Sequence, residues 1–512
     1  MFNRILFPST SSSEDQVQNE YPKCFKDLNL DQIISPVIKS KKDFKLDEYY
    51  INNLRDKTVI KYRQDVMKDM ENKTIRKVLS DFSDQIYHLS ERITNITDNL
   101  AKDEKQYSNY LTRGQMLHYC ELYCEEIDKL ADQIGSLDIA SEGLKEFLAY
   151  FAEYAVSREY TELKKDAAFS RAGLSTIKYC MYIKGNTIKV RKYEGEADHS
   201  EQLLNLFEKF RQANAYDYRQ KLPEIPSANH VEAQVLELLA GLYPEEFSTL
   251  KTFCDKHRDF LCEKLIVFSK EIQFYIAWLD FIQPLKDKGL SFHYPELAEK
   301  AGHIYALNCF DLALALSGTI PVTNDFELTK PEHIMVLTGP NQGGKTTFAR
   351  AFGQMHFLAS LGLCVPGTES TLYLFDKIFT HFEKEEDLNT LNGKLMDDLV
   401  RLHEILEEAT PDSITIINEI YSSTTLSDAL KLGKKMNEEI NKLEAPSIVV
   451  TFLDELALTG PETVSMMSTV YKDNPEKRTY KIVRKAPDGL AYAMYIAKKH
   501  GLSYEQLCGR LK

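Results

Sequence analysis

The fold is decided by Gly339-Pro340-Asn341-Gln342-Gly343-Gly344-Lys345-Thr346-Thr347, which satisfies the phosphate-loop pattern G-x-x-x-x-G-K-[ST]. The apolar run at 333–337 before it predicts a buried strand, and residues 347–361 after it predict a helix. In that setting the glycines let backbone N–H groups close around phosphates at a helix N-terminus, where the helix dipole favours anions. We expect Lys345 to reach the β- and γ-phosphates of ATP, and the Thr346 hydroxyl to bind Mg²⁺.

A second apolar, β-branched run at 413–417 is followed by Asn418 and Glu419. Phosphate-loop ATPases place an acidic strand end at this point, usually as an Asp-Glu pair. Glu419 is therefore the candidate catalytic residue, which would polarise the attacking water. Asn418 can hydrogen-bond a water bound to Mg²⁺, but it brings no negative charge to the ion.

Together these motifs resemble the ATPase domain of the MutS family, over about residues 300 to 512. Further stretches match the family's motifs in the same order along the chain. They are 361–366, 375–380, Thr424, Asp428, 450–456, 489–493 and 500–502. Residues 28–33, 62–67, 274–278 and 292–296 resemble the MutS core and lever helices more loosely. The resemblance implies an α/β phosphate-loop ATPase domain of the ABC type at the C-terminus, preceded by a mostly helical core and lever.

Three positions depart from the family pattern. The Asp on the Mg²⁺ side is Asn418 here, and the His that usually follows Thr at the end of the next strand is Phe452. The Ser-containing signature, which in the family reaches the γ-phosphate bound by the partner subunit, aligns with residues 392–398 and replaces the Ser by Gly393. We therefore expect ATP to bind, and hydrolysis to be slow or absent.

The sequence divides into a flexible N-terminal arm over 1–20, a helical core and lever over 21–300, and the ATPase domain over 301–512. Only residues 1–20 precede the core-like segment, so we expect a short paralogue that lacks the mismatch-reading domain and does not discriminate a mismatch.

An alternating pattern around Gly185-Asn186 predicts a β-hairpin over 177–193 that interrupts the helices. The hairpin carries the nucleic-acid candidates Lys184, Lys189, Arg191 and Lys192, and no acidic residue lies between 178 and 192. These cations could contact a phosphate backbone. Equally, they could be a solvated hairpin edge that lysines protect from aggregation.

Composition narrows the class of protein. The 512 residues include 77 Asp and Glu against 63 Lys and Arg, a net charge of −14. This balance argues against an avid, non-specific nucleic-acid binder, although a local basic groove remains compatible with it. The N-terminus predicts no signal peptide and no apolar run is long enough for a membrane span, so we expect a cytoplasmic protein without a membrane partner.

Three functions fit these observations. The first is an active MutS-like ATPase that acts on DNA in repair or recombination. The second is a non-hydrolysing, nucleotide-gated clamp, such as the degenerate half of a heterodimer. The third is a MutS-like factor that acts on RNA or ribosomes. Because MutS-type ATPases complete each nucleotide site from two subunits, the resemblance implies a homodimer or a heterodimer with a second MutS-like chain.

Overall fold

The computed structural model describes residues 2–9, 20–102, 106–185, 187–196, 230–299, 302–383, 393–471 and 474–487, with 504, 507 and 508. The chain forms two compact units. The first contains residues 1–2, 77–138 and 145–270; the second contains 3–76, 139–144 and 271–512. Residues 3–76 and 271–300 thus pack in the unit that holds the phosphate loop. The domain boundaries that the sequence predicts, after residue 20 and after residue 300, remain predictions.

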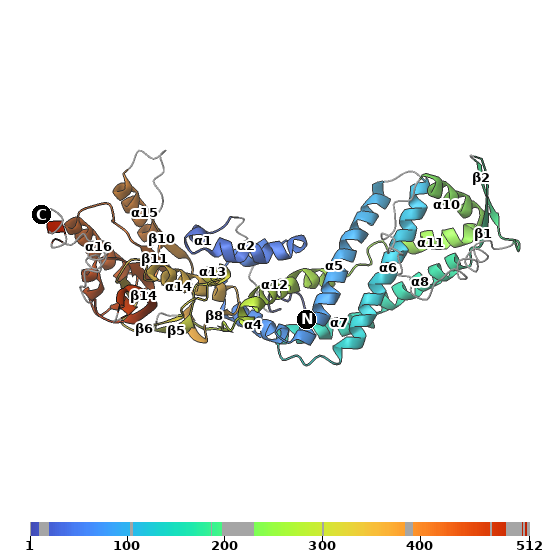
Figure 1. Cartoon of the computed structure of the whole chain (residues 1–512). Coiled ribbons are helices and arrows are strands. Elements are labelled where there is room, and N and C mark those ends of the chain that lie inside the picture. The colour runs from blue at the N-terminus through green and yellow to red at the C-terminus, as the bar shows by residue number, and fades with distance from the viewer. Residues whose placement is uncertain are drawn as a thin grey trace, which may run out of the picture. The chain divides into compact units, whose positions relative to one another are not determined.

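The first unit is built mainly from long helices (Figure 1). Within α6, buried residues recur every three or four positions, as at Leu117, Cys120, Cys124 and Ile127, which is the spacing of one helix face. Helix α6 packs against α8, α10 and α11. The helices of this region are α5 (Lys73–Lys102), α6 (Gln106–Ile134), α7 (Glu142–Ala155), α8 (Arg158–Ser175), α10 (His230–Leu242), α11 (Pro244–Lys256) and α12 (Glu263–Asp287). The chain passes between the units within α5, α7 and α12.

The hairpin predicted from the alternating pattern is present. Strand β1 (Tyr179–Lys184) pairs antiparallel with β2 (Thr187–Lys192), and Lys184 lies opposite Thr187. One face of β2 packs on α10, where Val190 joins an apolar cluster with Leu239 and Phe247. The turn residue Asn186 lies outside the described residues.

Within the segment 1–20, for which we expect a flexible arm, the start of the chain is largely buried. Phe2, Ile5 and Leu6 are all buried, because this start of the chain is apolar and packs against other parts of the protein. The carboxylate of the fully buried Glu271 accepts hydrogen bonds from the backbone N–H groups of Ile5 (2.9 Å) and Leu6 (3.4 Å) and pairs with Arg4. Residues 10–19 lie outside the described residues.

The second unit is organised around a sheet that has six strands among the described residues, in the order β10-β11-β12-β7-β13-β14. Neighbouring strands run parallel except for the antiparallel pair of β13 and β14. Every residue of β7, β11 and β12 is buried, as is usual for the central strands of a parallel sheet covered on both faces. The strands are β7 (Ile334–Thr338), β10 (Ile378–His381), β11 (Ile414–Asn418), β12 (Ser447–Val450), β13 (Thr463–Tyr471) and β14 (Asn474–Arg484).

Smaller sheets and further helices complete this unit. Helix α14 (Lys345–Ser360) is mostly buried and contacts β8, β9, β11 and β12. The smaller sheets pair β3 (Phe292–His293) with β8 (Val365–Pro366), and order β4 (Glu296–Ala298), β9 (Glu369–Tyr373), β5 (His303–Cys309) and β6 (Asn324–Thr329) as β4-β9-β5-β6. The other helices are α1 (Cys24–Asp27), α2 (Leu30–Ser40), α3 (Asp47–Ile51), α4 (Lys57–Met70), α13 (Leu312–Leu316), α15 (Lys394–Glu408) and α16 (Leu426–Asn441), with 3₁₀ turns η1 (Lys42–Phe44) and η2 (Asp454–Leu458).

Candidate nucleotide-binding site

The glycine-rich loop connects β7 to α14, as the sequence predicts. Gly339 and Gly344 have φ angles of +107° and +92°, a backbone conformation that favours glycine. At Gly343 the reason for glycine is space. A Cβ atom there would lie 2.3 Å from the Ser468 hydroxyl oxygen and 2.9 Å from the Pro340 carbonyl oxygen. The loop is therefore packed closely on β13, which carries Ser468.

Lys345 is the first residue of α14, and it is only 3% exposed. Its ammonium group donates to the carbonyl oxygens of Gly339 (2.8 Å) and Pro340 (3.3 Å), and it lies 3.5 Å from Asn341 Oδ1. Burial lowers the pKa of Lys345, while the Glu419 carboxylate acts in the opposite direction. The loop thus holds a buried cation on its own carbonyl groups, and phosphate oxygens are stronger acceptors for that cation.

The carboxyl end of β11 lies next to the start of α14. Thr346 Oγ1 donates a hydrogen bond to Asn418 Oδ1 at 2.9 Å. Glu419 follows with a φ of +53°, and its N–H donates to the Val450 carbonyl oxygen at 2.9 Å. The main chain therefore holds Glu419 at the strand end, and Glu419 lines the same cavity as Lys345 and Thr346.

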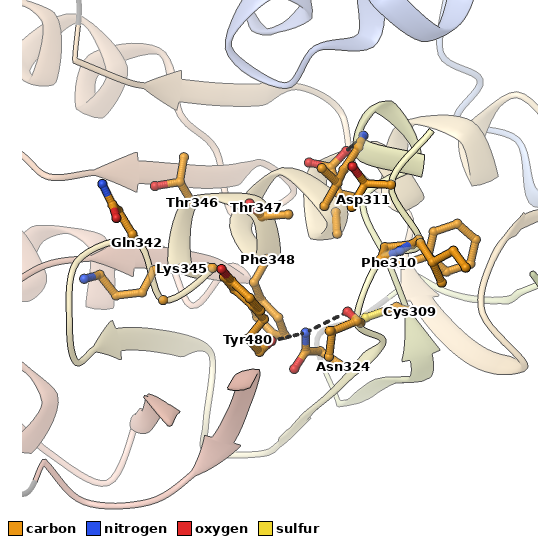
Figure 2. Close-up of a pocket in the computed structure, with 18 of the residues that line it drawn as sticks. Cys309, Phe310, Asp311, Asn324, Gln342, Lys345, Thr346, Thr347, Phe348 and Tyr480 are labelled. Carbon is orange, nitrogen blue, oxygen red and sulfur yellow. Dashed lines mark hydrogen bonds between the residues drawn. The ribbon is translucent and has the colours of Figure 1, made fainter. Parts of the chain in front are cut away.

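This cavity has a volume of about 520 Å³ and extends from the phosphate loop to an apolar wall. Figure 2 shows Lys345 and Gln342 at one end of the group of labelled residues, and Phe310 and Asp311 at the other. Ile320, Pro321 and Val322 also line it. A loop suited to phosphates beside an apolar wall can accept a ligand that has an anionic part and a flat, weakly polar part.

Sequence reasoning missed the residues of this wall. Asn324 on β6 donates to the Tyr480 carbonyl oxygen at 3.1 Å (Figure 2). It also accepts from the Ile482 N–H at 2.8 Å, and the two bonds hold β14 beside the cavity. Asp311 accepts from Gln354 Nε2 at 2.9 Å and from the Leu314 N–H at 3.1 Å, and burial raises the pKa of its carboxyl group. These residues come from separate strands and loops, so no local motif marks them.

The structure brings together the predicted phosphate-loop residues, Asn418 and Glu419. Of the other departures from the family pattern, neither Phe452 nor Gly393 is among the residues that line the cavity. Phe452 is 48% exposed. Gly393 precedes α15, and a Cβ atom there would meet nothing within 4 Å. Asn392 and the closing motifs at 489–493 and 500–502 lie outside the described residues.

The nucleic-acid candidates lie in the other unit and differ from one another. Lys184, Lys189 and Arg191 share one face of the hairpin, since Lys189 pairs with Tyr182 and Arg191 with Cys180. Arg191 is engaged by Glu196 at 2.7 Å and lies 4.7 Å from the centre of the Tyr182 ring. Glu196 lies just beyond the acid-free stretch that the sequence indicates, so Arg191 is partly neutralised.

Lys192 is on the opposite face of the hairpin, where its ammonium nitrogen lies 4.8 Å from the centre of the Tyr243 ring. Lys184 and Lys189 are exposed. The structure therefore leaves both interpretations of the hairpin open, with Lys184 and Lys189 as the stronger candidates for a phosphate contact.

Comparisons with known proteins identify the region around the loop. Residues 335–506 match the family described as MutS domain V. Over this part of the chain, the protein is similar to MutS proteins. The chain is 30% identical over 185 residues to the DNA mismatch repair protein MutS of Shouchella clausii, and 27% identical over 245 residues to that of Halalkalibacterium halodurans.

These matches cover only part of each MutS protein. They include 35% and 44% of this chain, and 21% and 27% of the two relatives. The chain therefore spans about a quarter of the length of the curated relatives it matches. Among the described residues, no helix is both long enough and apolar enough to cross a membrane.

Proposed function

We propose that this chain binds ATP with Mg²⁺ and acts as a nucleotide-gated, MutS-type DNA-binding protein that hydrolyses ATP slowly. The observation that carries the proposal is the convergence at one cavity of Lys345, the Thr346–Asn418 contact and Glu419. A buried cation and the N-terminus of α14 favour a polyphosphate, and the apolar wall provides a surface for the base.

The residues beside Lys345 fit a magnesium ion. Thr346 Oγ1 and Asn418 Oδ1 lie 2.9 Å apart, and both are hard oxygen atoms of the type that Mg²⁺ prefers. When bound, the ion would neutralise charge on the β- and γ-phosphate oxygens. Because Asn418 is neutral, the protein supplies less negative charge to this position than an Asp would.

Glu419 is the candidate for orienting the attacking water. Its backbone N–H donates to Val450 of β12, and the residue lines the cavity. A carboxylate held in this way can accept a proton from water as the phosphoryl group departs. Slow turnover is proposed because Asn418 lacks the second charge and because Phe452 cannot perform the hydrogen bonding of a His.

Dimerisation is part of the proposal and rests on the MutS resemblance. Large apolar side chains are exposed on the second unit at Leu426 (62%), Phe452 (48%) and Leu458 (68%). Exposed apolar residues of this kind are compatible with an interface that closes when ATP binds. The neutral Asn418 specifically favours a second candidate function, in which the chain is the non-hydrolysing subunit of a MutS-like heterodimer.

The test measures ATP binding by calorimetry, phosphate release under steady-state conditions, and molar mass by light scattering with and without ATP. Turnover is measured without nucleic acid, in the presence of branched, mismatched or single-stranded DNA, and in the presence of structured RNA. We expect ATP binding, slow release, and stimulation by a DNA substrate. No ATP binding would overturn the proposal, whereas stimulation by RNA alone would assign the chain to the RNA-linked class.

A further inference from the structure

Residues of the neighbouring strands β13 and β14 both approach the phosphate loop. Ser468 on β13 lies beneath Gly339 and Gly343, where added Cβ atoms would come within 2.9 Å and 2.3 Å of its hydroxyl oxygen. On β14, Tyr480 lies against Gly344, with its nearest atoms 3.8 Å from an added Cβ atom. β14 therefore forms part of the loop's environment, although it is more than a hundred residues away in sequence.

The same strand carries a cation to the loop. Arg478 Nε donates a hydrogen bond to the Asn341 carbonyl oxygen at 3.2 Å. Lys345 lies 3.5 Å from the side-chain oxygen of the same Asn341. The two cations thus meet at one residue of the loop, and the hydrogen bond aims the Arg478 side chain at the loop.

The charges around Lys345 are consistent with this placement. Burial is the main cause of the lowered pKa of Lys345, and the positive charge of Arg478 lowers it further, while the carboxylates of Glu419 and Asp454 act in the opposite direction. Two like charges held near one another are unfavourable unless an anion lies between them. Since position 418 is the neutral Asn418 in this chain, no carboxylate there offsets the second cation.

A phosphate group is a better partner for both cations than a main-chain carbonyl oxygen. Hydrogen bonds from a cation to an anionic oxygen are roughly twice as strong as neutral ones, and the planar guanidinium group can bind two phosphate oxygens at once. Because Lys345 is the residue that reaches the β- and γ-phosphates in such loops, a cation beside it faces the terminal phosphates.

We propose that Arg478 is a second phosphate-binding residue of this site, supplied in cis by β14, and that it favours nucleoside triphosphates over diphosphates. This inference rests on the proposed function, because it names a further contact to the same ligand. It also gives β14 a role in detecting the ligand, since the guanidinium group would move from the Asn341 carbonyl oxygen to the terminal phosphate.

The experiment compares Arg478→Gln with Lys477→Gln in the full-length chain. Lys477 is the exposed neighbour of Arg478 on β14, so the control removes the same charge from the other side of the strand. Calorimetry with ATP, ADP and AMP gives the affinities, and thermal melting reports folding. We expect Arg478→Gln to weaken ATP binding about ten- to a hundredfold, as removal of one charged hydrogen-bond partner implies. The affinity of Arg478→Gln for ADP should fall by less, and its affinity for AMP should be unchanged. The affinity of Lys477→Gln for ATP should stay within about twofold of the wild-type value.

Each other outcome has a definite meaning. If wild-type protein and Lys477→Gln bind ATP, and Arg478→Gln binds ATP equally well, the inference is overturned while the proposed function stands. Equal weakening for ATP, ADP and AMP together with a lower melting temperature would overturn it as well, because Arg478 would then only tether β14 to the loop. If wild-type protein binds no ATP, the proposed function fails and this inference fails with it.

Discussion

The phosphate loop carries one cation, Lys345, and the β1–β2 hairpin carries several, but these side chains differ in their exposure to solvent. At the loop, Lys345 is 3% exposed and is held by the carbonyl oxygens of the glycine-rich turn. On the hairpin, Lys184 and Lys189 are exposed, and Arg191 is paired with Glu196. A charge that is buried and fixed in advance interacts strongly with a ligand, whereas an exposed charge is screened by water and salt. Substitutions should therefore have large effects at the loop and small ones at the hairpin.

The largest expected effect is that of Lys345→Ala. Removing the ammonium group leaves the charge of the phosphates uncompensated at a buried position, so ATP affinity should fall by at least about a hundredfold. Calorimetry measures this decrease, and Lys434→Ala on the exposed face of α16 serves as the control. Unchanged affinity in Lys345→Ala would show that the loop is not a nucleotide site.

Glu419→Gln should separate binding from chemistry. The amide keeps the shape of the side chain but cannot accept the proton of the attacking water, so single-turnover hydrolysis should fall by about a hundredfold or more. ATP affinity should stay within about threefold, because Glu419 does not belong to the phosphate loop. Rapid-quench measurements with excess protein determine both quantities, and hydrolysis at the wild-type rate would remove Glu419 from the mechanism.

Gly343→Ala tests how tightly the loop is packed. The added methyl group would lie 2.3 Å from the Ser468 hydroxyl oxygen, and overpacking of this kind costs about 1–3 kcal/mol. We expect a lower free energy of unfolding in denaturant titrations and weaker ATP binding. The matched control is Gly393→Ala, which meets no atom within 4 Å. Similar decreases in stability in the two variants would contradict the close packing of the loop on β13.

The sequence could predict the loop because local residues encode it. The buried strand, the glycines and the start of the helix are adjacent in the sequence. Asn418 and Glu419 lie at the end of β11, which is separated from β7 by one parallel strand, β12. The carboxyl ends of β7 and β11 therefore lie at the same edge of the sheet. The contributions of β6 and β14 could not be predicted, since Asn324, Tyr480 and Arg478 reach the cavity or the loop only through long-range strand pairing. The burial of Ile5 and Leu6 was missed for the same reason, because Glu271, which accepts hydrogen bonds from their N–H groups, lies far along the chain.

Asn418→Asp restores the acid that the family pattern places beside the metal. The carboxylate would accept from Thr346 as the amide now does at 2.9 Å, and it would add a negative charge that favours Mg²⁺. We expect a lower Mg²⁺ requirement and a gain in turnover of only a few fold, because Phe452 and Gly393 are unchanged. Steady-state phosphate release at varied Mg²⁺ tests this expectation. Wild-type turnover near or above about 1 s⁻¹ would show that other residues already compensate for Asn418.

The smallest effect per residue is expected at the hairpin. If Lys184, Lys189 and Arg191 contact a phosphate backbone, replacing all three by Ala should weaken nucleic-acid binding regardless of sequence. It should also flatten the dependence of log affinity on log salt by up to about 0.9 for each duplex-DNA phosphate that is no longer neutralised. Arg191→Ala alone should change the slope least, because Glu196 already offsets its charge at 2.7 Å.

The informative comparison is therefore between two proteins: the double variant in which Lys184 and Lys189 are replaced by Ala, and the single variant Arg191→Ala. Fluorescence anisotropy at several salt concentrations gives the nucleic-acid affinity of each. Lys192→Ala is the matched control on the opposite face, where its ammonium group lies over the Tyr243 ring. If the salt dependence of log affinity becomes flatter in the Lys184 and Lys189 double variant but not in the Arg191 or Lys192 variants, the phosphate contact lies on the exposed face of the hairpin. An unchanged slope in the triple variant would mean that these cations are a solvated edge, and that any nucleic acid is bound elsewhere on the protein.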